Sequence, residues 1–442
     1  MIELQAAFGL QPPELVALTG GGGKSSLLFA LGAALSPPVI LTTTTRLFSA
    51  QLARAPAVWS LEEPAARLEA LLARHGRCLV VGRIEGDKAL GVPADLPAHL
   101  LGQPGVRFVV AEADGSRMRP CKAPAEHEPV VPLGTTLLVP LAGLDALEGP
   151  IEARCHRPER VATLTGLSPA EALTAEALAG LLAHPEGGLK GVPPTARVIP
   201  FLNKVEGMAR LAAARRVAGL ALAEPRISQV ALGSLKAAEP VIELWRRLTA
   251  VVLAAGQSRR MGATKQLLPW GATTVLGQTL RNLAAAGLTD VLVVSGHQAD
   301  KVESEARAAG ARTLFNPNYA AGEMLSSLQA ALRALPVATA AVLVAHADQP
   351  MLAPDTLERL LTAFRQGTGE LIAPTFKGQR GNPVLFGRAF FAELLALPAG
   401  GAPRDVVRRH ATELALVEVD DEAVLHDLDR PDEYARWRPA GP

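Results

Sequence analysis

The sequence predicts an α/β protein of two domains, each built on a mainly parallel sheet with helices on both faces. Three observations predict it. Short, continuously apolar segments alternate with segments of helical period, which is typical of buried parallel strands. An apolar strand, a Gly-rich turn and a helix follow one another twice, from about residues 15 and 251. The chain has 442 residues, a length that suits two or three domains.

The elements of the two domains are read from this alternation. We predict a first domain over residues 1–248 and a second over 249–442. Strands of the first are expected at residues 15–18, 39–41, 78–81, 108–111, 136–139 and 197–202. Strands of the second are expected at residues 251–253, 291–295, 313–315, 341–345 and 371–373. Its clearest helices are expected at residues 274–286, 325–335, 356–366 and 431–436, with Asp432 as the cap of the last.

The composition excludes several classes of function. Lys plus Arg total 44 and Asp plus Glu 43, a formal net charge of +1 that argues against a basic nucleic-acid binder. Hydrophobic residues make up 49% of the chain and charged residues 20%, so a large core is available. Aromatic residues make up only 4%, too few for surfaces that stack single-stranded bases. We expect small-molecule substrates and no nucleic-acid partner.

The sequence also carries expectations about location. No apolar run reaches the roughly 20 residues of a membrane span, and the first residues lack the pattern of a signal peptide. The three cysteines, Cys78, Cys121 and Cys155, show no CxxC spacing, which favours a reducing compartment over a disulfide framework. We therefore expect a cytoplasmic protein without a membrane partner.

The letters TGGGGKS follow the first strand and open a helix. A phosphate loop needs converging backbone N–H groups, a helix N-terminus and a lysine. Gly21, Gly22 and Gly23 supply the first and Lys24 the last, while Ser25 supplies a hydroxyl ligand for Mg²⁺. The usual pattern has a further glycine where this chain has leucine, so the loop is P-loop-like. The alternative is a flexible glycine turn.

Two further elements of the first domain are candidates for the same site. Glu112 and Asp114 follow the strand at residues 108–111, where a carboxylate holds Mg²⁺ or caps a helix, and Asp114 is the predicted ligand. Asn203 and Lys204 begin an Asn-Lys-x-Glu element after another strand. That element looks like the Asn-Lys-x-Asp guanine-reading element of GTPases, except that Glu206 stands in the last position. We predict that Asn203 and Lys204 bind nucleotide, as part of a site for a second NTP.

Five motifs of this half occur in a recognisable order. They are LTGGGGKS, LTTTTRLF, EADGSRMRP, KAPAEHEP and NKVE, over roughly residues 10–245. In this order they resemble the YqeC family, accessory proteins of selenium-dependent molybdenum hydroxylases. The resemblance implies a molybdenum hydroxylase as client and a role in its maturation, without defining a reaction. The basic residues Arg117, Arg119, Lys122 and His127 are read either as an anion site, for a phosphate-bearing pterin, or as a solvated loop.

The second domain opens with LAAGQSRRMGATK over residues 253–265. Gly256 lets backbone N–H groups approach a triphosphate. Arg260 and Lys265 bring two positive charges to its phosphates and stabilise the departing pyrophosphate. The alternative is an ordinary Gly-rich turn. The predicted nucleotide-binding residues are Leu253, Ala254, Ala255, Gly256, Ser258 and Gly262.

Acidic and polar residues further along would complete this site. An apolar strand delivers Asp348 to the carboxyl edge of the sheet, where it would coordinate Mg²⁺. Asp427 or Asp429 would be the other metal ligand, and the sequence leaves that choice open. Two loops are predicted to hold the acceptor, although a plain helix start and a plain turn explain them as well. Their residues are Ser326 and Ser327, from a loop that begins at Gly322, and Arg380, Gly381 and Asn382.

The ordered set LAAGxSxRMGxxK, ADQP, RGNPV and DLDxPD resembles the MocA-like nucleotidyltransferases, which include the molybdenum cofactor cytidylyltransferases. The match runs over about residues 250–437. It implies a Rossmann-like nucleotidyltransferase domain that transfers CMP from CTP to the terminal phosphate of molybdopterin. Arg260, Lys265 and Asp348 would be catalytic, with Mg²⁺. Ala255 stands where guanylyl-transferring relatives have glycine, which favours cytosine, whereas residues 401–405 depart from the family pattern.

The leading interpretation is a fused maturation factor for a molybdenum hydroxylase. One alternative keeps nucleotidyl transfer but uses GTP as donor or another phosphorylated acceptor, such as a sugar phosphate. Another is a non-catalytic carrier of the molybdenum cofactor. Pyrophosphate release separates the carrier from the transferases, and nucleotide selectivity separates the transferases from one another.

Overall fold

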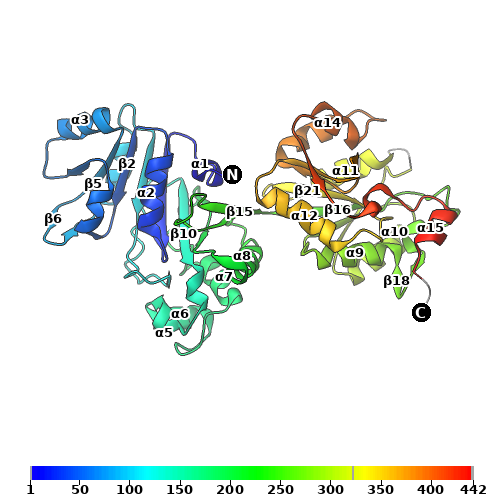
Figure 1. The fold of residues 1–442 in the computed structure, drawn as a ribbon, viewed down its shortest axis with the longest axis horizontal. Coiled ribbons are helices and arrows are strands. Elements are labelled where there is room, and N and C mark those ends of the chain that lie inside the picture. Colours follow the sequence, from blue (N-terminus) through cyan, green and yellow to red (C-terminus); the bar gives the residue numbers. More distant parts are fainter. Residues whose placement is uncertain (1, 321–322, 440–442) are drawn as a thin grey trace. The chain divides into compact units, whose positions relative to one another are not determined.

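The computed structural model describes residues 2–320 and 323–439. The chain divides into two compact units, Met1–Trp245 and Arg246–Pro442, just before the boundary predicted at Leu248 (Figure 1). Gly322, the first residue of one predicted acceptor loop, lies outside the described residues. In the described part of the chain, no helix has the length and apolar character needed to cross a membrane.

One large sheet organises the first unit. Among its described residues, ten strands pair in the order β15-β14-β13-β10-β1-β8-β2-β5-β4, with β12 beside β10. They are β1 (Glu14–Gly20), β2 (Val39–Thr43), β4 (Val58–Ser60), β5 (Arg77–Val81), β8 (Phe108–Glu112), β10 (Leu137–Gly143), β12 (Arg197–Val198), β13 (Phe201–Asn203), β14 (Gln229–Gly233) and β15 (Val241–Arg246). The central strand β1 runs parallel to both neighbours, β8 and β10. The predicted mainly parallel sheet is confirmed.

Helices cover both faces of this sheet. They are α1 (Leu4–Ala7), α2 (Lys24–Ala34), α3 (Ala65–His75), α4 (Leu96–Leu101), α5 (Ile151–Arg154), α6 (Pro158–Thr165), α7 (Ala175–Ala183) and α8 (Gly207–Ala221). Neighbouring residues of a strand point to opposite faces, so Val16 and Leu18 pack against α2, while Leu15 packs with α3 and α4. This is why the strand reads as one unbroken apolar run.

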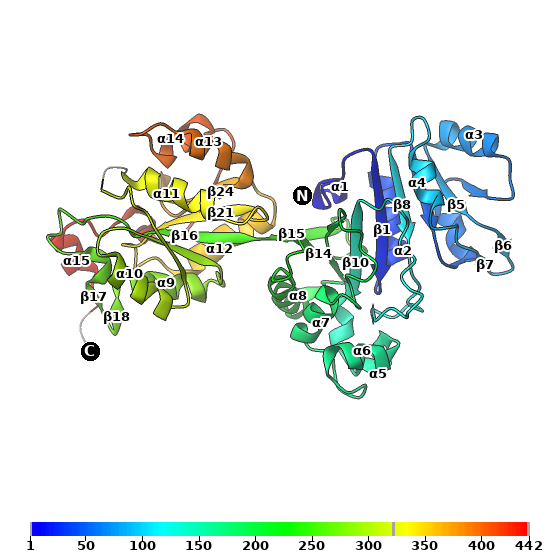
Figure 2. The same cartoon turned by 180° about the vertical axis from the view of Figure 1, so that it is seen from behind.

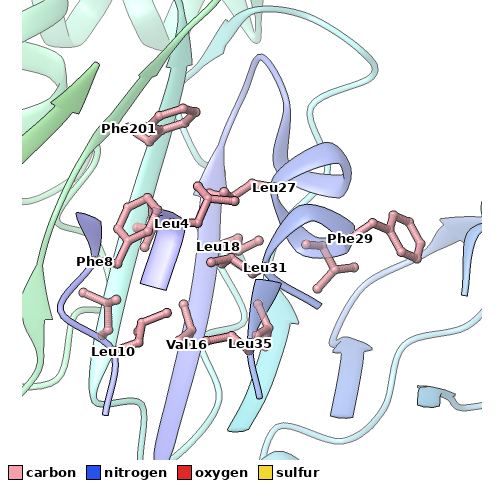
Figure 3. Close-up of a cluster of buried hydrophobic side chains, with 14 of the residues drawn as sticks. Leu4, Phe8, Leu10, Val16, Leu18, Leu27, Phe29, Leu31, Leu35 and Phe201 are labelled. Carbon is pink, nitrogen blue, oxygen red and sulfur yellow. The ribbon is translucent and has the colours of Figure 1, made fainter. Parts of the chain in front are cut away.

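The packing of α2 on β1 fixes the start of that helix. Figure 3 shows Leu27 and Leu31 of α2, and Leu35 just after it, beside Val16 and Leu18 of β1, and these residues belong to one buried cluster. Burying each such leucine is worth about 1.5–3 kcal/mol. The helix is therefore held along its length, and its N-terminus stays at the carboxyl end of β1.

The first unit also contains shorter strands and 3-10 helices. They are the pair β9 (Cys121–Lys122) and β11 (Cys155–His156), the three-stranded sheet of β3 (Leu47–Phe48), β7 (Lys88–Ala89) and β6 (Ile84–Glu85), and the 3-10 helices η1 (Ser49–Arg54) and η2 (Leu144–Leu147). The three cysteines are buried free thiols.

The second unit has a mixed sheet. Within its described residues eight strands pair in the order β20-β19-β16-β21-β24-β22-β23, with β25 beside β22. They are β16 (Leu248–Leu253), β19 (Val291–Ser295), β20 (Arg312–Phe315), β21 (Ala341–His346), β22 (Leu371–Phe376), β23 (Gln379–Arg380), β24 (Val384–Gly387) and β25 (Leu414–Glu418). A small hairpin joins β17 (Pro269–Trp270) and β18 (Thr273–Thr274).

The strands β20, β19, β16 and β21 are parallel, but β24 runs antiparallel to β21 and β22. The sequence predicts a mainly parallel sheet, and residues 375–386, rich in Gly, Pro and basic residues, predict a loop that enters a strand. A tight turn explains the difference, because Lys377 and Gly378 have φ of 50° and 79° between paired Phe376 and Gln379. Two consecutive residues with positive φ form the turn that suits a two-residue hairpin.

Helices also cover both faces of the second sheet (Figure 2). They are α9 (Val275–Ala285), α10 (Ala299–Ala308), α11 (Glu323–Ala334), α12 (Pro354–Arg365), α13 (Phe391–Ala396), α14 (Pro403–Arg409) and α15 (Pro431–Trp437), with η3 (Lys265–Leu267), η4 (Arg388–Phe390) and η5 (Glu422–Leu425). The cap of α15 differs from the prediction. Glu433 accepts from the backbone N–H groups of Asp429 and Arg430, both at 2.8 Å, whereas Asp432 lies in the first turn.

Candidate functional sites

The glycine loop of the first unit connects β1 to α2. Gly20, Gly22 and Gly23 have positive φ of 89°, 78° and 142°. A Cβ at Gly22 would lie 2.4 Å from the backbone nitrogen of Gly143, so a larger residue does not fit there. Leu18, where the usual pattern has glycine, is a buried residue of β1. The predicted turn and helix start are therefore present, although the loop departs from the usual pattern.

Lys24 lies beneath this loop and is nearly inaccessible, with 3% of its side chain exposed. Its Nζ donates to the carbonyl oxygen of Gly20 at 2.5 Å and lies 3.3 Å from Oδ1 of Asp114. Ser25 donates from Oγ to Oε2 of Glu112 at 2.8 Å. The structure thus brings Lys24 and Ser25 next to Asp114, which lies far from them in the sequence, because β1 and β8 are neighbours.

Glu112 belongs to this cluster as well, although only Asp114 was predicted as a metal ligand. Burial raises the pKa of its carboxyl group, although Lys24 and Ser25 oppose the shift. Oδ1 of Asp114 is buried without a hydrogen bond among the described residues. The hydroxyl oxygen of Ser25 and the carboxylate oxygens of Glu112 and Asp114 are metal ligands of the kind that a hard divalent cation prefers. The strand end AEAD was the available signal, since Glu112 and Asp114 lie two residues apart.

Asn203 and Lys204 lie against the same loop. Asn203 donates from Nδ2 to the carbonyl oxygen of Gly22 at 2.6 Å and accepts at Oδ1 from the N–H of Leu235 at 3.0 Å. Lys204 forms an ion pair with Asp145 at 2.8 Å. Both residues line a pocket of about 330 Å³ that also reaches the glycine loop. In this structure Asn203 braces the loop and uses both ends of its amide to do so.

The basic loop after Asp114 is partly internal. Lys122 is buried, and its Nζ lies 3.0 Å from Asp114 and 2.6 Å from Glu128. Arg157 adds two hydrogen bonds to Glu128, at 2.7 and 3.1 Å. The charge of Lys122 is therefore neutralised inside the protein. Arg117, Arg119 and His127 remain as candidates for binding an anion. Arg117 and Arg119 line a separate cavity of about 410 Å³.

Glu128 makes stability depend on pH. Burial opposes ionisation, but hydrogen bonds from Arg157 and Lys122 lower the pKa of its carboxyl from 4.5 to about 2. A lowered carboxyl pKa stabilises the fold above the unfolded value and loses that effect as the pH falls to the folded value. We expect Glu128→Gln to lower the free energy of unfolding by about 2 kcal/mol at pH 7, after allowance for solvent screening.

Urea unfolding of both proteins between pH 7 and pH 2 measures this effect. The difference between them should shrink as the pH falls from about 4.5 to 2. Glu69→Gln, at an exposed position of α3, is the matched control and should leave the curve unchanged. A difference that stays constant down to pH 2 would contradict the assignment.

The second candidate site lies at the carboxyl ends of β16 and β21. These strands are parallel, and Leu253 at the end of one pairs with His346 at the end of the other. The loop after β16 is held by Gln266, which donates from Nε2 to the carbonyl oxygen of Ala254 at 3.2 Å. Ser258 donates from Oγ to Oε1 of Gln266 at 3.2 Å and accepts from the N–H of Lys265 at 3.1 Å. These bonds fold the loop back over the strand end.

Lys265 lies among carboxylates. Its Nζ contacts Oδ2 of Asp348 and lies 2.6 Å from Oδ1 of Asp429. Arg260 donates to the other oxygen of Asp429 at 3.1 Å, with 74% of its side chain exposed. Burial would lower the pKa of Lys265, but the two carboxylates more than offset it and raise the pKa. Lys265 is thus fully charged at neutral pH.

A cavity of about 540 Å³ opens at this point. Its lining includes the predicted residues Leu253, Ala255, Gly256, Ser258, Arg260, Lys265, Ser327, Asp348 and Asp429. Ala254 is buried at the end of β16, and Gly262 has a positive φ of 71° in the loop. The size of the cavity suits a nucleotide-sized ligand.

Three side chains offer a metal site beside Lys265. Ligand atoms of His346, Asp348 and Asp427 lie within 4.8 Å of one another. Oδ1 of Asp427 is buried without a hydrogen bond among the described residues, with Nδ1 of His346 at 3.5 Å. Burial opposes both charges, yet the carboxylates raise the pKa of His346 and the histidine lowers the pKa of Asp427. An imidazole and two carboxylates fit a divalent cation.

This arrangement distinguishes Asp427 from Asp429, between which the sequence could not choose a metal ligand. Asp427 lies with the metal-binding group, whereas Asp429 pairs with Arg260 and Lys265. His346 is a residue that the sequence analysis did not assign to the metal site. Its signal was the spacing, because His346 and Asp348 lie two residues apart at the end of one strand.

The predicted acceptor residues fall into two groups. Ser326 and Ser327 both accept from Nδ2 of Asn316, at 2.9 and 3.0 Å, and Ser327 reaches the cavity. Arg380, Gly381 and Asn382 are not among the described residues that line it. Gly381 packs against Val424, whose carbonyl oxygen would lie 2.4 Å from an added Cβ. The structure does not bring this second loop to the cavity.

Comparison with known proteins accounts for both units. A family model of the YqeC protein matches residues 16–159, and a model of the MobA-like NTP transferase domain matches residues 250–414. The chain joins a YqeC domain to a MobA-like NTP transferase domain. Both resemblances found from the motifs are confirmed, as is the nucleotidyltransferase class of the second unit. The YqeC match ends before Asn203, so that element lies outside it.

The two domains are similar to different proteins. The YqeC protein of Escherichia coli (strain K12) is 33% identical over 124 residues, 28% of this chain but only 46% of that protein. The molybdenum cofactor cytidylyltransferase of the same organism is 27% identical over 190 residues, 42% of this chain and 93% of that protein. The nicotine blue oxidoreductase of Paenarthrobacter nicotinovorans is 28% identical over 197 residues, 43% of this chain and 95% of that protein.

Proposed function

We propose that the MobA-like domain transfers CMP from CTP to the terminal phosphate of molybdopterin. The product is molybdopterin cytosine dinucleotide, and pyrophosphate is released. The observation that carries the proposal is the convergence of Arg260, Lys265 and Asp348 on one nucleotide-sized cavity. The similarity to the molybdenum cofactor cytidylyltransferase of Escherichia coli supports the choice of donor and acceptor.

The reaction needs charge stabilisation more than a base. An oxygen of the acceptor phosphate attacks the α-phosphorus of CTP, a new P–O bond forms, and the bond to the bridging oxygen of the β-phosphate breaks. The electron pair leaves on pyrophosphate. Because the nucleophile is already an anion, no proton has to be removed. Lys265 and Arg260 would hold the triphosphate and stabilise the charge on the leaving group.

A divalent cation would complete the proposed active site. His346, Asp348 and Asp427 would hold it, and Asp429 would position Lys265 and Arg260. When bound, the cation neutralises phosphate charge and so favours the approach of two anions. The residues Ser326 and Ser327 are proposed to contact the acceptor, and Arg380, Gly381 and Asn382 would do so only if their loop approaches the cavity.

The YqeC domain is proposed to act as a nucleotide-binding accessory module in maturation of a molybdenum hydroxylase. Its glycine loop, Lys24 and Ser25 would bind the phosphates of a second NTP, with Mg²⁺ on Ser25, Glu112 and Asp114. Covalent fusion raises the effective concentration of one domain for the other. We further propose a cytoplasmic location and no membrane partner.

The decisive experiment is pyrophosphate release by the full chain. Purified protein receives Mg²⁺ or Mn²⁺, molybdenum-loaded molybdopterin, and CTP, GTP or ATP in separate reactions. Release with CTP supports the proposal, and release with GTP alone overturns the choice of base. No release with active cofactor overturns molybdopterin as the acceptor and leaves another phosphorylated acceptor or a carrier. NADH oxidation, which the oxidoreductase relative prompts us to test, should remain at background.

The histidine in the metal site predicts a choice of ion. Both ions favour oxygen ligands, but Mn²⁺ accepts an imidazole nitrogen more readily than Mg²⁺ does. We expect half-maximal pyrophosphate release at a Mn²⁺ concentration about tenfold below that of Mg²⁺. His346→Asn replaces the nitrogen donor with an oxygen donor and should remove most of that advantage.

Titration of each metal against the initial rate makes this comparison. The exposed histidine variant His99→Asn, in the other unit, is the control for general effects of histidine removal. An unchanged ratio of the two half-maximal concentrations in His346→Asn would exclude His346 as a ligand.

A further inference from the structure

The pocket beside the glycine loop has a second end. At the first end it is lined by Gly22, Lys24 and Ser25, and at the other by Lys204 and the segment 234–236. The second end forms because β13 and β14 are parallel neighbours, with Leu202 paired to Leu232. Segments that follow parallel strands emerge at the same edge of a sheet. The pocket of about 330 Å³ therefore extends from the start of α2 to two segments that no comparison assigns.

A carboxylate lies beside this second end. Glu206 is not itself among the described residues that line the pocket, but it is bonded to Ser234, which is. Glu206 accepts at Oε1 from the hydroxyl of Ser234 at 3.1 Å, and its Oε2 lies 3.6 Å from Nη1 of Arg210. Its side chain is 49% exposed, so the carboxylate is oriented yet accessible to a ligand. Each oxygen retains lone pairs for further donors, because an ionised carboxylate accepts about four hydrogen bonds.

Asn203 ties the two ends of the pocket together. Its amide bonds the glycine loop through Gly22 on one side and the segment after β14 through Leu235 on the other. Buried amides with both ends satisfied hold their neighbours in one arrangement. The position of Ser234, and with it that of Glu206, is thus coupled to the phosphate end.

The lining carries more cations than acids, with Glu112 as the one acid among the described lining residues. Lys24 and Lys204 are paired with acids, and further cations contribute to the wall. These are Arg46, Arg54, Arg117 and Lys236. A polyphosphate is the ligand chemistry that suits such a wall next to a helix N-terminus and glycine N–H groups.

We infer that this pocket binds a guanine nucleoside diphosphate or triphosphate, with Glu206 reading the base. Guanine presents two adjacent donors on one edge, N1–H and the N2 amine, and a carboxylate accepts both at once. Adenine presents an acceptor at N1 and no donor at C2, so the same carboxylate faces it unfavourably. The inference rests on the proposed phosphate-binding role of the glycine loop and adds the identity of the base.

Glu206 also explains why the last position of the Asn-Lys-x-Glu element tolerates a longer acid. The hydroxyl of Ser234 and the guanidinium of Arg210 orient the longer side chain. The sequence alone left guanine recognition open at this point. The contact across 28 residues between Glu206 and Ser234 is what favours it.

The test measures binding of GDP, ADP and xanthosine diphosphate to the full chain with Mg²⁺ by equilibrium dialysis. Only binding that Lys24→Met abolishes is attributed to this pocket, which excludes the site of the other domain. We expect GDP to bind at least about tenfold more tightly than ADP, the range for hydrogen bonds to a charged group. Glu206→Gln should remove that preference.

Glu206→Gln should also bind xanthosine diphosphate more tightly than the unaltered chain does. Xanthine keeps N1–H but carries a carbonyl at C2, so a glutamine amide accepts from one and donates to the other. Xanthosine diphosphate should therefore bind Glu206→Gln at least about tenfold more tightly than the unaltered chain. A misfolded variant cannot produce this gain. Glu176→Gln, at a surface ion pair with Arg216, is the matched control and should alter neither ligand.

The outcomes separate the two proposals. Equal binding of GDP and ADP, or an unchanged preference in Glu206→Gln, overturns guanine recognition by Glu206. It does not affect the proposal that the glycine loop binds phosphate. Absence of any binding that depends on Lys24 overturns the phosphate loop and this inference with it. Pyrophosphate release from CTP reports on the other domain and is unaffected by either result.

Discussion

Asp348→Asn should reduce pyrophosphate release by about a thousandfold while the protein stays folded. The substitution keeps the shape of the side chain and removes its charge, so the proposed metal site loses one of its two carboxylates. Loss of a group that stabilises transition-state charge costs about 10²–10³ in turnover, and loss of bound metal adds to this. The fold should tolerate the change, because Lys265 keeps its ion pair with Asp429.

Initial rates at saturating CTP, together with the thermal midpoint, measure this effect. The half-maximal metal concentration should rise in the same variant, which a purely structural defect does not explain. Asp355→Asn removes an exposed carboxylate paired with Arg359 and is the control. Turnover within about threefold of the unaltered chain would remove Asp348 from the proposed mechanism.

Lys265→Met should have the second-largest effect, a loss of about 10²–10³ in turnover. Lys265 is the cation nearest both Asp348 and Asp429, and it is mostly buried. If it stabilises the leaving pyrophosphate, the loss falls mainly on kcat, since that charge develops only in the transition state. A loss confined to KM would instead indicate simple binding of CTP.

The same variant makes a second, independent prediction about stability. Without Lys265, Asp348 and Asp429 face each other with no shared cation, and the thermal midpoint should fall at neutral pH. A divalent cation should restore part of it, and by more than it stabilises the unaltered chain. Lys301→Met, at an exposed position of α10, serves as the control. Equal metal stabilisation in all three proteins would contradict the arrangement.

The effects of Asp348 and Lys265 should not add. The two side chains are in contact, so each substitution removes part of what the other removes. The double variant is therefore expected to lose less activity than the product of the two single losses. An additive double variant would mean that the residues act at separate steps.

Much of the fold could be predicted because its signals are local. Continuous apolar runs predicted the parallel strands around β1 and β16, and the helices of the second domain at residues 274–286 and 356–366 lie within about two residues of α9 and α12. The antiparallel direction of β24 was not predicted, since the turn at Lys377 and Gly378 carries a weak signal. Asp432 was wrong as a cap because α15 begins one residue earlier, at Pro431, with Arg430 at its N-cap.

The sequence by itself determined the two domains, their families and the charged residues of both loops, because each motif is a short run of neighbouring residues. Only the tertiary structure decided which of those charges meet. It set Asp427 beside His346 and Asp429 beside Lys265, and it joined Glu206 to Ser234. Such pairings depend on which strand ends share an edge of a sheet, and strand order is a long-range property that no local pattern encodes.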